Sequence, residues 1–341
     1  MATDNEIAVV DRVSQPRVAF WPMNKRMGFT VRRIERADTE QLTALVVESF
    51  ADEISLANLG AKAVQNQIRS AVAASRPPAA LLLQLAGLTF EFWVAVDGSR
   101  VLGCYALHGR SLVTLANLAV RPGMRGQGIG SALMEHAMER ANGLGRSGML
   151  LEVLADNEPA VRLYRSAGFQ VYDCRRSYLA RLTASRLDAP LNSRVHLVPI
   201  TRGHVQSWSA VLRASVPPEA LILAHTYRSE YVSNAIGRWF GERLTLTPVF
   251  RRAIMIDGTV GGFMTMRVPR WRSVTDLHVP LYSSAAASEL ADIIRLATRE
   301  AAAHSDCCRL YLSEARAEGN AAALQAGYEP ERLWSYMHRH L

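Results

Sequence analysis

The predicted strands and helices follow the same order twice along the chain. Each half contains two alternating apolar runs joined by Asp-Gly, at positions 97–98 and 257–258, and this pattern is typical of a β-hairpin. Each half also contains a helix that ends at Ala-Gly followed by an aromatic residue, Phe169 or Tyr328. The repetition indicates an internal duplication, which predicts two domains of one fold.

The length of 341 residues suits two domains of ordinary size. Strands alternate with helices in both halves, which predicts an α/β layer fold. We expect an N-terminal extension over residues 1–27, a first domain over 28–183, a linker over 184–195 and a second domain over 196–341. Within the extension, Met23 and Met27 are alternative translation starts.

Composition and charge exclude several classes of protein. Apolar residues make up 49 % and charged residues 21 % of the chain, which is typical of a soluble globular protein. No stretch approaches the roughly 18 apolar residues of a membrane span, and residues 1–27 lack the apolar core of a signal peptide. We therefore expect a cytoplasmic protein. The net charge of +8 comes from scattered arginines, which favours a solvated basic surface over nucleic-acid binding.

The cysteines predict reduced thiols and no metal site, because their spacing matches no metal-ligand pattern. They are Cys104, Cys174, Cys307 and Cys308.

A glycine-rich turn, Arg125–Leu133, connects a predicted strand to a predicted helix. Its glycines let the backbone approach a ligand closely, and the unpaired amides at the positive end of the helix suit a pyrophosphate. A nucleotide-binding P-loop would need a lysine after the glycines, and a dinucleotide-binding turn would need a glycine where Leu133 stands. Arg125, Gly128 and Gly130 satisfy the coenzyme A pattern R/Q-x-x-G-x-G/A. That pattern alone does not exclude a plain glycine-rich turn.

A second motif begins at Asn157, one strand after the turn. Asn157, Ala160 and Tyr164 are spaced by three and four residues, which places them near one face of a helix. The two motifs in this order, with Leu118–Val120 before the turn, resemble the GNAT superfamily of N-acetyltransferases. The resemblance covers residues 28–183.

The resemblance implies two GNAT-like domains, each with a mixed, mostly antiparallel and splayed sheet flanked by helices, and acetyl-CoA as the co-substrate. It implies that the strand before the turn pairs with the pantetheine arm and that amides of the turn hold the pyrophosphate. It also implies that Asn157 contacts the cofactor and that Tyr164 protonates the departing thiolate. The cofactor-binding residues implied in this way are Leu118, Ala119, Val120, Arg125, Gly126, Gln127, Gly128, Ile129, Gly130, Ser131 and Asn157.

Glu152 is a lone carboxylate in the apolar run Met149–Leu154. An ammonium group, with a pKa of about 10, must lose a proton before it attacks a thioester, and a carboxylate can accept that proton directly or through water. The position of Glu152 also resembles that of the base in the ribosomal-protein N-terminal acetyltransferases of the family. The alternative is an outward-facing residue on a solvated sheet face. Other family members carry the carboxylate on the preceding strand, where this chain has Asn117, which cannot act as a base.

Two further features also have alternative interpretations. The phenol of Tyr164, with a pKa of about 10, can donate to a thiolate whose conjugate acid has a pKa of about 8.5, or the ring can simply pack under the sheet. The stretch Arg175–Tyr178 resembles the closing hairpin with which protein N-terminal acetyltransferases bind the main chain of their substrate. We favour a basic edge strand that its arginines keep soluble.

The second half lacks the catalytic features of the first. Tyr282–Ala287 stands in place of the glycine turn and contains no glycine, and no tyrosine matches Tyr164. Glu314 echoes Glu152 without a cofactor turn beside it. This half is therefore predicted to be a degenerate GNAT-like domain that packs against the first and helps to wall the acceptor site.

The sequence predicts an N-acetyltransferase that moves an acetyl group from acetyl-CoA to a primary amine by direct attack in a ternary complex. A small-molecule acceptor is favoured because residues 56–87 and the second half could enclose a pocket. An open groove beside Tyr178 would instead favour a protein acceptor, either an N-terminal amine or a lysine. A non-catalytic module that binds acyl-CoA is a rival of another class. The acceptor, the acyl chain length, a ligand of the second half and the oligomeric state stay open.

Overall fold

The structure is a computed structural model that describes residues 28–51, 61–85, 87–183, 193–201, 203–215, 248–268 and 274–341. The predicted N-terminal extension, residues 1–27, and residues 184–192 of the predicted linker lie outside these ranges. No helix of the described residues is long and apolar enough to cross a lipid bilayer.

Twelve strands of the described residues form one continuous sheet in the order β1-β2-β3-β4-β5-β12-β6-β11-β10-β9-β8-β7. The strands are β1 (Thr30–Arg33), β2 (Thr89–Asp97), β3 (Arg100–Gly109), β4 (Leu112–Val120), β5 (Gly148–Leu154), β6 (Gln170–Arg181), β7 (Val195–Pro199), β8 (Val249–Ile256), β9 (Thr259–Arg267), β10 (Val274–Tyr282), β11 (Cys307–Ser313) and β12 (Glu329–His340). The β4–β5 and β10–β11 pairs are parallel, and the other neighbours are antiparallel. The mixed, mostly antiparallel sheet confirms the predicted α/β fold.

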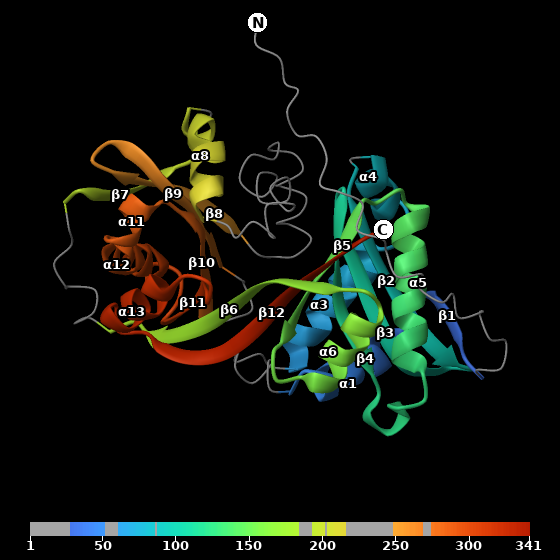
Figure 1. Ribbon diagram of the computed structural model, residues 1–341. Coiled ribbons are helices and arrows are strands. Elements are labelled where there is room, and N and C mark those ends of the chain that lie inside the picture. The colour runs from blue at the N-terminus through green and yellow to red at the C-terminus, as the bar shows by residue number, and fades with distance from the viewer. Residues whose placement is uncertain are drawn as a thin grey trace, which may run out of the picture.

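Helices flank the sheet in both halves (Figure 1). The α-helices are α1 (Thr39–Ser49), α3 (Ala61–Ala74), α4 (Ala79–Leu85), α5 (Ile129–Gly143), α6 (Glu158–Ser166), α8 (Trp208–Ser215), α11 (Ser284–Ala287), α12 (Leu290–Ala301) and α13 (Ala317–Gln325), and the 3-10 helices are η1 (Arg36–Asp38), η2 (Pro122–Met124) and η3 (His204–Ser207). The two predicted hairpins are β2–β3 and β8–β9. Their turns contain Gly98 and Gly258, with φ of +56° and +77°, a conformation that glycine adopts without strain.

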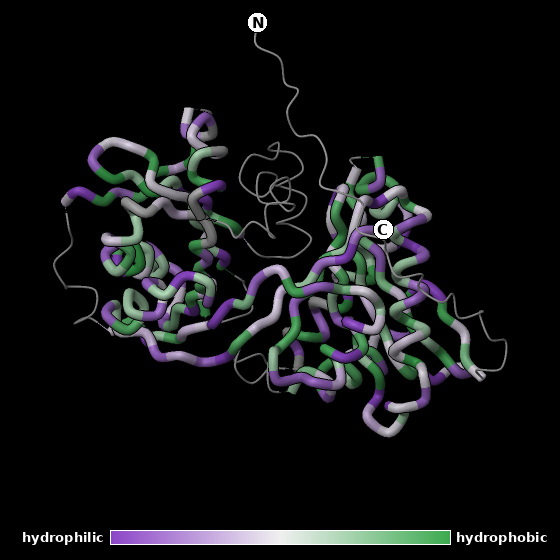
Figure 2. Tube along the Cα trace, in the orientation of Figure 1, coloured by the Kyte–Doolittle hydropathy of each residue, from purple (hydrophilic) through white to green (hydrophobic). Residues whose placement is uncertain are grey.

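Each half buries its own hydrophobic core against the sheet. In the first half, Leu133 of α5 and Tyr164 of α6 belong to the core on one sheet face, and Leu42 of α1 and Ile68 of α3 belong to a separate core on the other. In the second half, Ile293 of α12 is fully buried in a core that also includes residues of β6. A further core joins Leu150 of β5 to Trp208 of α8 and Phe263 of β9, and Figure 2 shows hydrophobic segments throughout both halves.

The two halves exchange strands reciprocally at the centre of the sheet. β12, from the end of the second half, lies between β5 and β6 of the first, while β6 lies between β12 and β11 of the second. Figure 1 shows β6 and β12 running side by side between the halves. Arg175 and Trp334, each the sixth residue of its strand, face each other across this pair. The predicted first domain, residues 28–183, therefore contains a sheet that also includes a strand of the second half.

Side chains of β12 anchor this strand to the first half. Arg339 donates a hydrogen bond to the carbonyl of Ala167 at the C-terminal end of α6, where a cation also meets the negative end of the helix dipole. Arg332 forms an ion pair with Asp156, with an N–O distance of 3.4 Å. β12 thus belongs to the first half both by strand pairing and by its side chains.

Candidate active site

The strands β4 and β5 pair only at their first residues. Their parallel register covers Leu112–Thr114 of β4 and ends at Leu150 of β5. Asn117 has a φ of +53°, and the pairing of β3 with β4 shifts register around it, so a bulge bends β4 at this point. Ala119 and Val120 consequently pair with β3, and Leu118–Val120 have no strand partner on the β5 side among the described residues. A ligand can pair with that free edge.

The glycine turn leads directly from this edge to the start of α5. Gly128 is the N-cap of α5 with a φ of +80°, and no side chain caps the helix. A Cβ at Gly130 would lie 3.4 Å from Leu163 of α6, so this glycine allows the close approach of the two helices. The arrangement leaves the first amides of α5 uncapped by side chains, at the positive end of the helix dipole, where an anionic phosphate binds favourably.

The other predicted residues of the turn differ in exposure. The side chains of Arg125, Gln127 and Ser131 are exposed, and Arg125 donates from Nε to the carbonyl of Val120 at 3.2 Å. Ile129 is only 2 % exposed and packs in the core. The side chain of Ile129 therefore positions the helix, and only its backbone is available to a ligand.

Asn157 caps the helix α6. Its Oδ1 accepts a hydrogen bond from the backbone N–H of Ala160 at 3.3 Å, as N-cap asparagines commonly do. The side chain is otherwise exposed. The structure thus assigns Asn157 a structural role, and contact with a cofactor stays a prediction.

Tyr164 is buried below the sheet, with its ring centroid 6.2 Å from that of Phe169. Among the described residues, none forms a hydrogen bond with its hydroxyl. Burial raises the pKa of Tyr164 to about 12. The phenol therefore stays protonated at neutral pH and can act as a proton donor.

Glu152 is the exposed residue of β5, whose other residues are buried. Its neighbours Leu151 and Val153 point into the core below α5 and α6, so Glu152 points to the opposite face of the sheet. Directly across from it on the exchanged strand β12 lies Tyr336. The sequence analysis missed Tyr336, because no local motif marks it and only the pairing of β12 with β5 brings it here.

The strands β10 and β11 of the second half correspond to β4 and β5 of the first but stay paired over a longer stretch. β10 and β11 stay paired over five positions, from Val274 to His278. The guanidinium of Arg316, the N-cap of α13, lies 3.5 Å from the ring centroid of Tyr282 and donates to the carbonyl of Tyr282 at 2.7 Å. In the first half, Asn157 holds this N-cap position. An arginine thus fills the end of the strand that would receive a cofactor.

The predicted equivalence of Glu314 and Glu152 is wrong. Glu152 is the fifth residue of β5, and the fifth residue of β11 is Tyr311. Glu314 follows β11 and accepts a hydrogen bond from Arg176 at 2.8 Å.

The prediction of a basic edge strand at Arg175–Tyr178 is also wrong. These residues belong to β6, which has a strand on each side. Arg175 is 8 % exposed and its Nε lies 2.7 Å from Oδ2 of Asp173. Tyr178 is 1 % exposed within the core of the second half.

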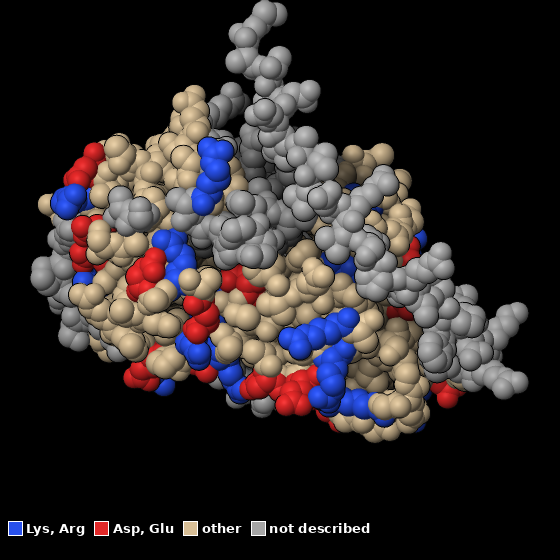
Figure 3. All heavy atoms as spheres, viewed as in Figure 1, with Lys and Arg blue, Asp and Glu red and all other residues tan. Residues whose placement is uncertain are grey.

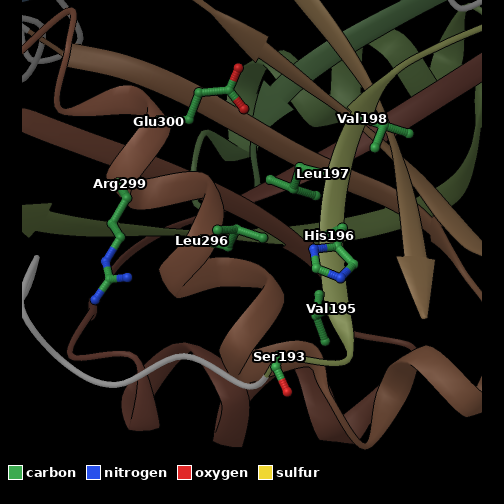
Figure 4. Close-up of a pocket in the computed structure, with 8 residues that line it drawn as sticks. All are labelled: Ser193, Val195, His196, Leu197, Val198, Leu296, Arg299 and Glu300. Carbon is green, nitrogen blue, oxygen red and sulfur yellow. The ribbon is translucent and has the colours of Figure 1, made fainter. Parts of the chain in front are cut away.

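A pocket of about 640 Å³ lies at the far edge of the sheet, between β7 and α12. Figure 4 shows its lining, with Leu296 of α12 pointing towards the strand. The lining residues are Ser193, Val195, His196, Leu197, Val198, Leu296, Arg299 and Glu300. Because seven strands lie between β4 and β7 in the sheet, this pocket is separate from the glycine turn.

Charged side chains of both signs are interspersed over the face that Figure 3 shows. Within the described residues, no three His, Cys, Asp or Glu side chains gather as a metal site would require. The candidate site is therefore defined by the free edge of β4, the start of α5, Tyr164 and Glu152.

Residues 89–171 match the family described as "Acetyltransferase (GNAT) domain". This stretch is therefore a GNAT acetyltransferase domain. Among solved structures, it is similar to a tandem GNAT protein from the clavulanic acid biosynthesis pathway, with a TM-score of 0.59 and 16 % identity, over 92 % of this chain and 98 % of that chain. Both halves thus share the fold of a tandem GNAT protein.

Three curated relatives match short stretches of the chain. The [ribosomal protein bS18]-alanine N-acetyltransferase of Escherichia coli K12 is 43 % identical over 65 residues, which are 19 % of this chain and 44 % of the relative. Peptidyl-lysine N-acetyltransferase YiaC of the same strain is 34 % identical over 83 residues, 24 % and 51 % of the two chains. Streptothricin acetyltransferase of Streptomyces lavendulae is 44 % identical over 57 residues, 17 % and 30 %. The chain spans about half or less of the length of these relatives.

Proposed function

We propose that this protein is an N-acetyltransferase that transfers an acetyl group from acetyl-CoA to a primary amine in its first half. The observation that carries the proposal is the free edge of β4. This edge leads into the start of α5, where no side chain caps the helix. This edge can pair with an extended pantetheine arm, and the helix start can hold the pyrophosphate. Among the described residues of the second half neither feature is found, and Arg316 fills the equivalent place.

The residues around this edge can perform direct transfer. The N–H groups of Leu118–Val120 polarise the thioester carbonyl, as donors of an oxyanion site do. The carboxylate of Glu152 takes the proton from the acceptor ammonium, so that the neutral amine attacks the carbonyl carbon. Tyr164 gives its phenolic proton to the sulfur as the carbon–sulfur bond breaks. No covalent enzyme intermediate is needed, because both substrates meet in one complex.

A small-molecule acceptor is supported by the surroundings of Glu152. His108 lies on the same sheet face, through its pairing with Thr114 and the pairing of Thr114 with Leu150. Leu150, the partner of Thr114 on β5, belongs to a hydrophobic core that also contains Trp208 of α8 and Phe263 of β9. Both α8 and β9 belong to the second half. That half therefore helps to enclose the acceptor side of the sheet.

A protein acceptor is the second candidate, because two curated relatives are named for acetylating an alanine of a ribosomal protein and peptidyl-lysine. A non-catalytic module that binds acyl-CoA is the third. We place the protein in the cytoplasm and divide it at residues 28–183 and 196–341 as predictions from the sequence alone.

Thiol release from acetyl-CoA, measured across a panel of amines, tests the proposal. The panel contains an alanine-starting peptide, an Nα-acetyl-lysine amide, streptothricin and glucosamine. We expect turnover with one acceptor class, and loss of turnover in a Gly128→Ala/Arg125→Ala variant but not in Gly123→Ala. Binding of acetyl-CoA without turnover in any acceptor would favour the non-catalytic module, and absence of binding would refute the proposal.

A further inference from the structure

The exchanged strand brings Tyr336 next to the candidate base. Tyr336 of β12 is paired in register with Glu152 of β5. Residues directly opposite each other in an antiparallel pair have Cβ atoms about 5 Å apart and point to the same face. Glu152 and Tyr336 are therefore neighbours on the same face of the sheet, although they are far apart in the sequence.

A chain of polar contacts fixes the ring of Tyr336. The guanidinium of Arg175 lies 4.2 Å from the centroid of this ring, within the range of a cation–π contact. Arg175 is held at 2.7 Å by Asp173, and the other oxygen of Asp173 accepts a hydrogen bond from Ser313 at 2.7 Å. The ring of Tyr172 packs edge-on at 6.2 Å. Tyr336 is thus held in one orientation by residues of β6 and β11.

The hydroxyl of Tyr336 is available to a ligand or a water molecule. The residue is only 4 % exposed, yet none of the described residues forms a hydrogen bond with its hydroxyl. Burial, and then the charge of Glu152, raises the pKa of Tyr336 well above the ordinary value, against the opposing charge of Arg175. The phenol therefore stays neutral and acts as a donor. A buried donor is costly unless it meets an acceptor.

The equivalent positions of the second half show the opposite arrangement. Tyr336 is the eighth residue of β12, and the eighth residue of β6 is Ser177. Ser177 is fully buried and donates to Glu331 at 3.1 Å, and Glu331 also accepts from Arg309 at 2.7 Å. Tyr311, which holds the position of Glu152, is stacked on His278 with centroids 4.5 Å apart. At these positions of the second half, Ser177 and Tyr311 each contact a neighbouring side chain. The first half instead places a carboxylate and a phenol next to each other.

We propose that Tyr336 is a positioning residue of the acetyl-transfer site, where its phenol and Glu152 together hold the water molecule through which the acceptor amine loses its proton. The inference rests on the proposed function. The proton passes from the ammonium to the water, and the water gives a proton to the carboxylate. The phenol donates a hydrogen bond to the water oxygen and keeps its own proton. The last strand of the chain is thereby part of the site in the first half.

The test compares Tyr336→Phe with Tyr178→Phe in the full chain. The second variant is a matched control, because the hydroxyl of Tyr178 is buried in the core of the second half with no partner among the described residues. The first readout is kcat/KM for whichever of the four panel amines is turned over, together with KM for acetyl-CoA. The second is the pKa of Glu152, from carbon NMR of ¹³C-labelled glutamate, assigned with Glu152→Gln.

For Tyr336→Phe we expect kcat/KM for the amine to fall about tenfold to hundredfold, with KM for acetyl-CoA unchanged. The pKa of Glu152 should rise, because its carboxylate loses part of its hydrogen-bonded support. Tyr178→Phe should match the wild type in both readouts. An unchanged pKa of Glu152 in Tyr336→Phe would overturn the inference, whatever the rate. If the wild type transfers no acetyl group, the proposed function fails. The NMR titration still shows whether the hydroxyl of Tyr336 affects Glu152.

Discussion

Glu91 of β2 shows, at the scale of single residues, how this protein holds a buried charge. It is 8 % exposed and accepts hydrogen bonds from Arg33, from Arg140 of α5 and from the indole of Trp93. Burial alone would raise its pKa, but the hydrogen bonds from Arg140 and Trp93 and the two positive charges lower it below the ordinary value. The residue joins β1, β2 and α5 at one point.

Replacing this carboxylate should destabilise the fold. Glu91→Gln removes the charge that faces Arg33 and Arg140, which should lower the free energy of unfolding by about 1–3 kcal/mol at pH 7. A depressed carboxyl pKa stabilises the fold above the ordinary value of about 4.3 and loses that effect as the pH falls through the folded pKa. The difference between variant and wild type should therefore shrink below about pH 4. Urea unfolding across pH measures this, and an equal difference at pH 3 and pH 7 would contradict it. Glu139→Gln, at an exposed position of α5, serves as the control.

Tyr164 carries a prediction about catalysis. Tyr164→Phe should lower kcat about tenfold to hundredfold, because the sulfur then leaves without a proton donor. Since burial raises the pKa of Tyr164 to about 12, the loss should have the same size from pH 7 to pH 10. Steady-state rates and acetyl-CoA titrations check this, and the dissociation constant should not change. A loss confined to low pH would argue against Tyr164 as the donor.

The site residues differ in how far the sequence could predict them. Glu152 and the glycine turn stand out because a charge in an apolar strand and clustered glycines are local signals. Tyr336 carries no such signal, since its role depends on a strand pairing between distant parts of the chain. Glu314 was wrongly matched with Glu152 because the sequence does not show where β11 ends. Glu314 is the first residue after this strand.

At the scale of secondary-structure elements, the hairpins and the start of α5 follow from local chemistry. Asp-Gly turns and a left-handed glycine at a helix start need no tertiary contact to be recognised. The environment of β6 was predicted wrongly because its arginines suggested an edge strand. In the structure, Asp173 and Glu314 pair with Arg175 and Arg176 and allow these charges inside the sheet.

The turn before α5 carries the prediction at this scale. Gly128 has a φ of +80° and Gly123 does not have a positive φ. Gly128→Ala should therefore lower the free energy of unfolding by about 1–2 kcal/mol, and raise the KM for acetyl-CoA, because the turn that we propose to hold the pyrophosphate shifts. Gly123→Ala should change neither quantity appreciably, since a Cβ there meets nothing within 4 Å. Thermal unfolding and steady-state kinetics of the two variants decide this, and equal effects would show that backbone conformation is not the cause.

At the scale of the whole molecule, the repeat was visible in the sequence but the exchange of strands was not. A duplicated order of elements is equally compatible with two closed domains. The exchange requires β12 to pair with β5 and β6 to pair with β11, and strand pairing between distant segments leaves no local pattern.

Cutting the linker tests the exchange. A protease site is inserted within residues 184–192 and cleaved after folding. The two halves should then elute as one particle on size-exclusion chromatography, because β12 pairs with β5 and β6 of the first half. The fragment 1–183 expressed alone should aggregate, since β5 and β6 would present unpaired edges. The uncleaved insertion chain is the control. A soluble, folded fragment 1–183 would show that the first half does not need β12.

The distance along the chain between β5 and β12 also has a consequence for synthesis. At about 5–20 residues per second, a ribosome needs on the order of 10–30 s to pass from β6 to β12. During that interval the nascent first half has its glycine turn and Glu152 but not the strand that pairs with β5. Acetyl transfer would then begin only after β12 has been synthesised and has paired with β5 and β6.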